Sequence, residues 1–214
     1  MNKHHLIISG TGRAGTTFLV QLLTELGLDT GFKDAFSEFH ASCNAGMEWN
    51  LRREDAPYVV KSPELCEYLD EVLKTGDVVI DHAIVPVRDL YEAAESRRQV
   101  SRAAGGKRGA KGGLWLTKNP QAQEAVLAKQ FCNLVRTLVE HEVPTIFLDF
   151  PRLVKDSEYL YAKLKPALPG VGYDAFCRAF QKLSNPKLVH QFSNREGSGH
   201  EASLFSRLRK LVSP

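Results

Sequence analysis

The chain has 214 residues, enough for a buried core, and we expect residues 1–214 to form a single domain. Hydrophobic residues make up 43% and charged residues 25%, as in ordinary globular proteins, and a formal net charge of +3 does not argue for a nucleic-acid partner. The four cysteines are scattered, which favours neither zinc nor a disulfide framework, and no apolar run approaches the ~20 residues of a membrane span, so we expect a cytoplasmic protein.

The first predicted elements are a short buried strand over residues 5–8, a glycine-rich turn, and an amphipathic helix over residues 18–26. Gly10, Gly12 and Gly15 let the backbone of the turn approach an anion closely. The N–H groups and the dipole at the start of the helix favour that anion. The stretch therefore predicts a phosphate-binding loop, with an ordinary strand–turn–helix corner as the alternative.

The loop begins like a triphosphate-binding loop but then departs from it. Thr16 stands where such a loop needs a lysine to reach the β- and γ-phosphates, and a cation appears three residues earlier as Arg13. The turn thus keeps a phosphate-binding backbone without the lysine of a nucleoside triphosphatase.

The later part of the chain alternates apolar runs with helical periodicity. Residues 28–57 are rich in carboxylates and aromatic side chains and are expected to form a long loop over one edge of a sheet. Asp89 is expected to cap the helix that follows it. Further strands are predicted over 58–63, 83–87 and 144–150, and further helices over 63–74, 90–102, 120–141, 153–164 and 172–183, with a basic helical turn over 207–210.

Residues 103–119 form the clearest break in this pattern. Five glycines and three cations between 103 and 113 predict a mobile, basic loop. A solvated linker and a lid over an anionic ligand both fit this composition.

Strands separated by long helices predict a three-layer α/β/α fold with a mostly parallel sheet, like that of the P-loop nucleoside triphosphate hydrolases. In such folds, ligands bind at the carboxyl ends of the strands. The chemically rich segments fall at these ends: 9–17, 61–64, 88–96 and 149–152.

Four segments together resemble the P-loop sulfotransferases, over about residues 5–165. The first is the run from Arg13 to Thr17, and the second is Arg88 at a strand end with Ser96 eight residues later. The strand ending in Lys61 and the segment 148–153 are softer likenesses. The resemblance implies transfer of a sulfuryl group from 3′-phosphoadenosine 5′-phosphosulfate, without a metal, to a hydroxyl or amine of a small molecule, lipid or saccharide.

The resemblance also implies a set of donor-binding residues. Arg13 would take the place of the family's lysine and contact the leaving phosphate, while Arg88 and Ser96 would hold the 3′-phosphate. The full set expected to bind the donor is Gly12, Arg13, Ala14, Gly15, Thr16, Thr17, Arg88 and Ser96.

The general base is the main departure from the family pattern. Cytosolic members carry a histidine two residues after the lysine of the second strand, and this chain has Pro63 there. Other branches use a carboxylate from the excursion after the first helix, so Glu38 and Asp34 are the favoured candidates, each of which also fits a solvated surface carboxylate. The further candidates are Glu48 and His40.

Two other functions fit parts of the sequence. A P-loop kinase or nucleotide hydrolase would use Asp81, in the apolar run that starts at Val78, to bind magnesium. A non-catalytic nucleotide-binding module would keep the fold and lose the base.

Overall fold

The computed structural model describes residues 2–40, 45–105 and 110–185. Its central sheet has four parallel strands, in the spatial order β4-β1-β5-β6, and a two-stranded antiparallel ribbon, β2-β3, lies beside it. The strands are β1 (Lys3–Ile8), β2 (Phe39–His40), β3 (Ala45–Gly46), β4 (Val59–Lys61), β5 (Val78–Val87) and β6 (Thr145–Asp149). The α-helices are α1 (Thr16–Glu25), α2 (Leu65–Lys74), α3 (Leu90–Ala103), α4 (Gln123–Glu140), α5 (Ser157–Leu164) and α6 (Tyr173–Leu183), and the 3₁₀ turns are η1 (Pro120–Ala122), η2 (Arg152–Val154) and η3 (Lys165–Ala167).

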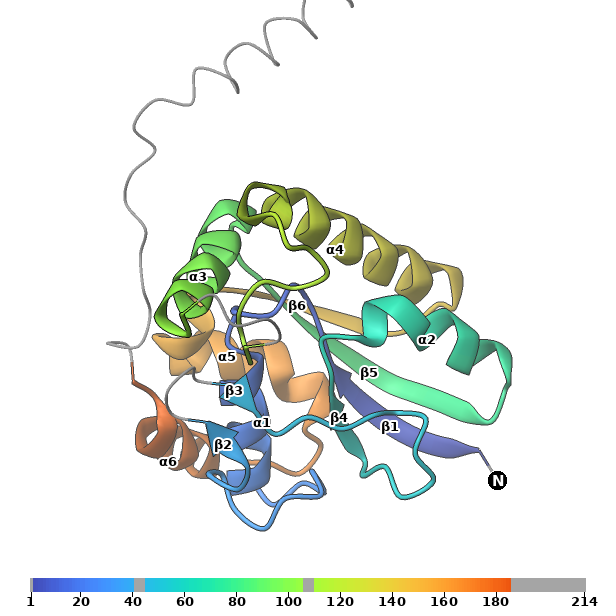
Figure 1. Ribbon diagram of the computed structural model, residues 1–214. Helices are drawn as coiled ribbons and strands as arrows, with labels where there is room; N and C mark the ends of the chain where they lie inside the picture. Colours follow the sequence, from blue (N-terminus) through green and yellow to red (C-terminus); the bar gives the residue numbers. More distant parts are fainter. Residues whose placement is uncertain (1, 41–44, 106–109, 186–214) are drawn as a thin grey trace, which may run out of the picture.

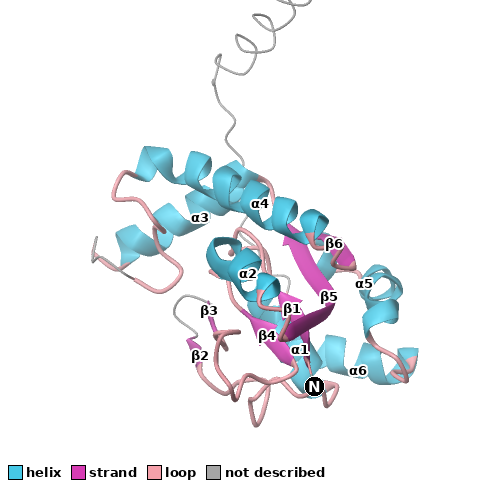
Figure 2. Ribbon diagram, turned by 90° about the vertical axis from the view of Figure 1, so that its right-hand side faces the viewer, coloured by secondary structure: helices cyan, strands magenta, loops and turns pink. Residues whose placement is uncertain are grey.

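Helices cover both faces of the sheet, because successive residues of its buried strands point to opposite sides. Leu6 and Ile8 of β1 pack in one core with residues of α1, α5 and α6. Ile7, between them, packs in a second core with residues of α2 and α4. Figures 1 and 2 show the resulting three layers, and the predicted α/β/α fold with a parallel sheet is confirmed.

The chain reverses its direction across the sheet at β1, the strand that leads into the glycine loop. α1 connects β1 to β4 on one side, and α2 then carries the chain back past β1 to β5. Ile8, the last residue of β1, pairs with Lys61 of β4 and with Ile84 of β5. The loop after β1 therefore starts at a topological switch point, where open parallel sheets bind their ligands.

Most predicted elements are confirmed, with shifted ends. Asp89 caps α3 as expected, because its carboxylate accepts a hydrogen bond from the Glu92 amide. The single helix predicted over 153–164 is wrong: residues 152–154 form η2, and α5 starts only after Asp156, whose side chain accepts from the Tyr159 amide. The predicted basic turn over 207–210 lies outside the described residues.

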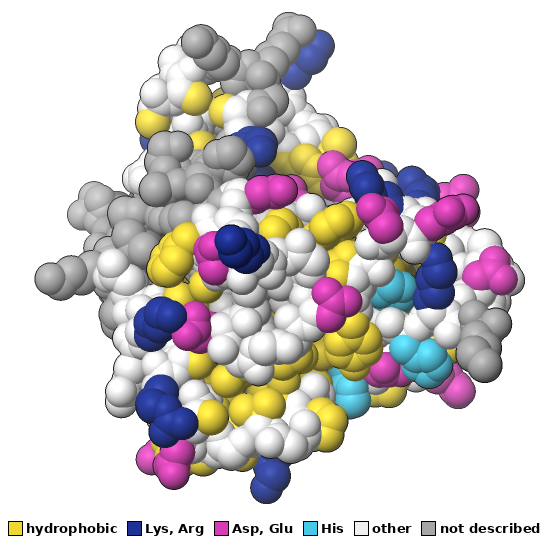
Figure 3. Space-filling view, turned by 90° about the horizontal axis from the view of Figure 1, so that it is seen from below, with side chains coloured by type: hydrophobic (Ala, Val, Ile, Leu, Met, Phe, Trp, Pro, Cys, Tyr) yellow, Lys and Arg dark blue, Asp and Glu magenta, His cyan; other side chains and the backbone are white. Residues whose placement is uncertain are grey.

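One face of the molecule carries an ordinary mixture of charges. On the face shown in Figure 3, acidic and basic side chains are interspersed, and histidine side chains lie close to acidic ones. None of the helices in the described part of the chain is long and apolar enough to cross a membrane.

Candidate functional site

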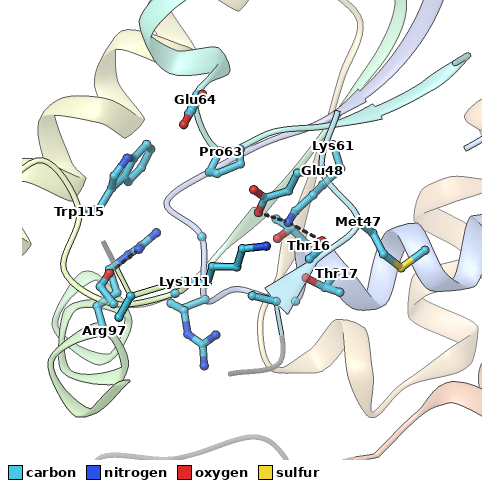
Figure 4. Close-up of a pocket in the computed structure, with 18 of the residues that line it drawn as sticks. Thr16, Thr17, Met47, Glu48, Lys61, Pro63, Glu64, Arg97, Lys111 and Trp115 are labelled. Atoms are coloured by element: carbon cyan, nitrogen blue, oxygen red, sulfur yellow. Dashed lines mark hydrogen bonds and ion pairs between the residues drawn. The ribbon is translucent and has the colours of Figure 1, made fainter. Parts of the chain in front are cut away.

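A cavity of about 460 Å³ lies at the carboxyl end of the sheet, between the glycine loop, the β2–β3 region and the segment that follows α3. Figure 4 shows how side chains from these three parts converge on it. The residues that line it include Gly12, Arg13, Gly15, Thr16, Thr17, Glu38, Glu48, Lys61, Arg97, Lys111 and Trp115.

The glycine loop has the backbone shape of an anion cradle. Gly10, Gly12 and Gly15 all have positive φ, at 149°, 66° and 83°, and Arg13 adopts the left-handed region at 58°. The hydrogen bonds of α1 begin at Leu19, whose amide donates to the carbonyl of Gly15 in the loop. The amides before it have no partner within the helix and are available to an anion at the helix N-terminus.

Arg13 joins the two sequence motifs that were predicted to act together. Its Nε donates to the Ser96 Oγ at 3.1 Å, across 83 residues of sequence. The Arg88 guanidinium donates to the Arg13 main-chain carbonyl at 2.8 Å. Arg13, Arg88 and Ser96 therefore meet at one place beside the loop.

Arg88 lies on the other side of the loop from the first cavity. It lines a second cavity of about 580 Å³, together with Thr11, Phe131 and Phe150. Its guanidinium lies 4.9 Å from the centre of the Phe150 ring and forms an ion pair with Glu92 at 3.2 Å. Burial lowers the pKa of Arg88 from its ordinary value, although Glu92 acts in the opposite direction.

Lys61, at the end of β4, supplies a second cation to the first cavity. The Nζ atom lies 2.6 Å from the Glu48 carboxylate and donates to the Gly46 carbonyl at 3.0 Å. Burial lowers the pKa of this lysine, while Glu48 raises it and the nearby guanidinium groups of Arg97 and Arg13 lower it further. The side chain is 4% exposed, whereas that of Glu48 is 50% exposed and faces the cavity.

Arg97 is a functional candidate that the sequence analysis missed. Its guanidinium donates to the Thr11 carbonyl and to the Gly113 carbonyl, both at 2.9 Å, and lies 5.1 Å from the centre of the Trp115 ring. Burial lowers its pKa to about 10. Its position directly after Ser96 was a signal, but sequence alone cannot distinguish it from the neighbouring Arg98.

The predicted bases separate in space. Glu38 and Glu48 line the first cavity, whereas Asp34 is exposed outside its lining and accepts a hydrogen bond from the Phe36 amide at 2.8 Å. The side chain of His40 lies outside the described residues.

The remaining predicted donor residues occupy the loop and the start of α1. Ala14 is fully buried and lines neither cavity. The other four, Gly12, Gly15, Thr16 and Thr17, line the first cavity together with Arg13.

The segment predicted as a basic linker or lid contributes a wall of the cavity where it is described. Residues 110–115 line it, and Figure 4 shows Lys111 between Arg97 and the Glu48–Lys61 pair. Residues 106–109 lie outside the described part of the chain.

Asp81, the predicted magnesium ligand of a kinase or hydrolase, lies in the wrong part of the sheet for that role. It comes three residues before Ile84, the partner of the last residue of β1, and so lies about 10 Å toward the amino end. Its carboxylate contacts His4 at 2.7 Å and the Tyr58 hydroxyl at 3.2 Å. No group of three or more metal-ligating side chains occurs among the described residues.

No model of a known protein family and no curated protein matches the chain. Among solved structures, the chain is similar to the sulfotransferase domain from the curacin biosynthetic pathway, at 14% sequence identity and a TM-score of 0.47, over 98% of this chain and 99% of that one. The family of the chain stays a prediction.

Proposed function

We propose that the protein is a sulfotransferase that moves a sulfuryl group from 3′-phosphoadenosine 5′-phosphosulfate to a hydroxyl or amine acceptor. The observation that carries the proposal is the contact of Arg13 with both Ser96 and Arg88 beside a glycine loop that lacks the triphosphatase lysine. Two separate anion-binding groups thus meet at one loop, which suits a donor with a phosphosulfate and a second phosphate.

The donor would bind around the loop. Its phosphosulfate would accept hydrogen bonds from the free amides of the first turn of α1 and from Arg13, Thr16 and Thr17. Its 3′-phosphate would bind Arg88 and Ser96. The Ser96 hydroxyl, which accepts from Arg13 in the structure, can rotate to donate to a phosphate oxygen instead.

In the transfer step, the acceptor oxygen or nitrogen forms a bond to sulfur while the bond from sulfur to the bridging phosphate oxygen breaks. The electron pair of the broken bond stays on the phosphate, and the acceptor proton goes to a carboxylate. Arg13 and Lys61 would stabilise the charge that develops around the bridging oxygen and the sulfuryl group. The leaving group is adenosine 3′,5′-bisphosphate, and no metal is required.

Glu48 is the base that we propose first, and Glu38 is the second candidate. Both carboxylates line the cavity, but only Glu48 forms an ion pair with a cation of the site, Lys61 at 2.6 Å. That pair would keep the carboxylate and the ammonium group side by side next to the reacting atoms. A base must lie within hydrogen-bond reach of the acceptor proton, and Asp34 does not line the cavity, so it is the weaker candidate.

The first experiment tests donor binding. Adenosine 3′,5′-bisphosphate should raise the melting temperature without magnesium, since a ligand at roughly 100 times its Kd adds about 2.7 kcal/mol of stability. If ATP with magnesium raises the melting temperature and the bisphosphate does not, the proposal is refuted in favour of a kinase or hydrolase.

The second experiment separates an enzyme from a non-catalytic module. Turnover of the phosphosulfate donor with a panel of phenols, amines, saccharides and lipids should be seen in the wild type and be reduced by ~10²-fold or more in Glu48→Gln, the scale of general-base catalysis. Asp34→Asn is the matched control and should keep the activity. Binding without turnover on any acceptor class would favour the module. The acceptor and the cytoplasmic location stay predictions.

A further inference from the structure

Arg97 is a buried cation without a carboxylate partner in the described ranges of the chain. The guanidinium donates to two main-chain carbonyls and lies against the Trp115 ring, and its Nε atom is buried with no hydrogen-bond partner. The adjacent Arg98 is nearly as buried, but it forms an ion pair with Glu95 at 3.0 Å and donates to the Pro120 carbonyl. Two consecutive arginines of α3 are therefore treated differently by the fold.

An unpaired buried charge is costly, because the protein interior replaces hydration poorly. The surroundings of Arg97 add to the cost. The nearby Arg13 repels it, and Glu48, a carboxylate that attracts it, is already paired with Lys61. Of the two buried cations that line the cavity, Lys61 has a carboxylate partner and Arg97 has none among the described residues, and an anionic ligand would supply the missing charge.

Arg97 also connects two walls of the cavity. One NH₂ group binds the Thr11 carbonyl in the glycine loop and the other binds the Gly113 carbonyl in the segment 110–115. Gly12 leaves room for the guanidinium in this position, since a Cβ atom at residue 12 would clash with an Arg97 nitrogen and force the guanidinium to move. The planar guanidinium is suited to bind both carbonyls at once, which a lysine ammonium does poorly.

We propose that Arg97 is a positioning residue of the anion site, which clamps the glycine loop to the 110–115 wall and whose charge is balanced by the anion of the bound ligand. The identity of that ligand as the phosphosulfate donor rests on the proposed function. The clamp and the charge requirement concern any anion of the phosphate class in this cavity.

The test measures affinities for two probes, adenosine 3′,5′-bisphosphate and inorganic pyrophosphate, by calorimetry at low and high salt. Arg97→Gln should weaken binding by ~100-fold or more and reduce its salt dependence, because one buried charge is lost. Arg97→Lys should recover part of the affinity and the full salt dependence, yet stay ~10-fold weaker than wild type because it cannot bridge both carbonyls. Arg98→Gln, the matched control, should bind like the wild type.

The outcomes distinguish this inference from the proposed function. Wild-type affinity in Arg97→Gln would overturn the inference and leave the sulfotransferase proposal intact. Binding of pyrophosphate but not of the bisphosphate, lost in Arg97→Gln, would support the inference and refute the sulfotransferase. Binding of neither probe by the wild type would overturn both. If Arg97→Gln does not fold, Arg97→Lys decides: wild-type affinity in it would show that the clamp has no role.

Discussion

The two ends of the parallel sheet treat charged side chains in different ways. At the amino end, Asp81 contacts His4 and the Tyr58 hydroxyl; His4 is exposed, and the other two groups are partly exposed. At the carboxyl end, the guanidinium groups of Arg88 and Arg97 are buried and donate to main-chain carbonyls. Arg88 also pairs with Glu92, but Arg97 has no carboxylate partner among the described residues. A carbonyl satisfies a hydrogen bond without neutralising a charge, so the carboxyl end holds a buried positive charge that a bound anion would neutralise.

The largest expected effect concerns Arg88. Arg88→Ala should weaken binding of adenosine 3′,5′-bisphosphate by about 2 to 5 kcal/mol, the usual cost of truncating one partner of a buried charge pair. Arg152→Ala is the matched control, since Arg152 also pairs with a carboxylate four residues later and stacks on an aromatic ring, but is exposed outside both cavities. Calorimetric titration measures both. Equal affinities in the two variants would mean that Arg88 and Ser96 do not form a phosphate site.

The second effect compares two glycines at the opposite ends of α1. Gly15 and Gly27 both have φ of 83°, so alanine at either position costs about 1 to 2 kcal/mol of backbone strain. At Gly15 the added Cβ would also lie 3.1 Å from Leu153 and 3.3 Å from Phe150, whereas at Gly27 it meets nothing within 4 Å. Gly15→Ala should therefore lose about 1 to 3 kcal/mol more in unfolding free energy, the usual cost of overpacking.

Urea denaturation measures this difference directly, and the bisphosphate affinity provides a second readout. Gly27→Ala should leave the affinity unchanged, because its site is at the end of α1 remote from the loop. If both variants lose the same stability, the packing of Phe150 and Leu153 against the loop is looser than the structure indicates.

The sequence was sufficient for the fold and the loop because both depend on local patterns. Apolar runs of strand length, helical periodicity and an N-cap at Asp89 are written in consecutive residues, and the glycine spacing marks the anion cradle before any contact is known. The division of residues 152–164 into a 3₁₀ turn and a helix was not predicted. Asp156 caps α5, so the helix starts after it and does not include the residues before it.

The partners of the site could not be predicted in the same way, because tertiary packing decides them. Arg97 and Arg98 are consecutive, and only the packing of α3 directs the first to the loop and the second to Glu95. The same holds for the carboxylates after α1. Glu48 reaches Lys61 through the pairing of the chain beside β4, while Asp34 forms a local turn with the Phe36 amide.

The third prediction uses pH to compare a lysine at each end. Burial lowers the pKa of Lys61 below 10.5, so above its folded-state pKa the unfolded chain binds more protons than the folded protein. The penalty of burying the charged lysine is thus present in full at lower pH and is relieved as pH rises, and stability gains with pH. As the pH rises, the unfolding free energy of the wild type should increase relative to that of Lys61→Met, by at most about 1.4 kcal/mol per pH unit.

Lys74, at the end of α2, is the control for this measurement. It is exposed, and its hydrogen bond with Asp70 raises its pKa. The wild type should therefore gain no stability over Lys74→Met as the pH rises. Urea denaturation between about pH 7 and about pH 10.5 covers the window. Parallel profiles of wild type and Lys61→Met would indicate that Lys61 is as well solvated as an ordinary surface lysine.

The smallest expected effect belongs to Asp81, at the amino end. The His4–Asp81 pair is accessible to solvent on the His4 side, and surface pairs contribute up to about 1 kcal/mol, so Asp81→Asn should change stability by less than this. Its bisphosphate affinity and any turnover should equal those of the wild type, since the carboxylate lies in the amino-terminal part of β5, remote from the loop. A magnesium-dependent activity lost in Asp81→Asn would contradict this, because it would require a metal-bound ligand at the amino end, where the Asp81 carboxylate already contacts His4 and Tyr58. Wild-type behaviour would confine the chemistry to the end where Arg88 and Arg97 are buried.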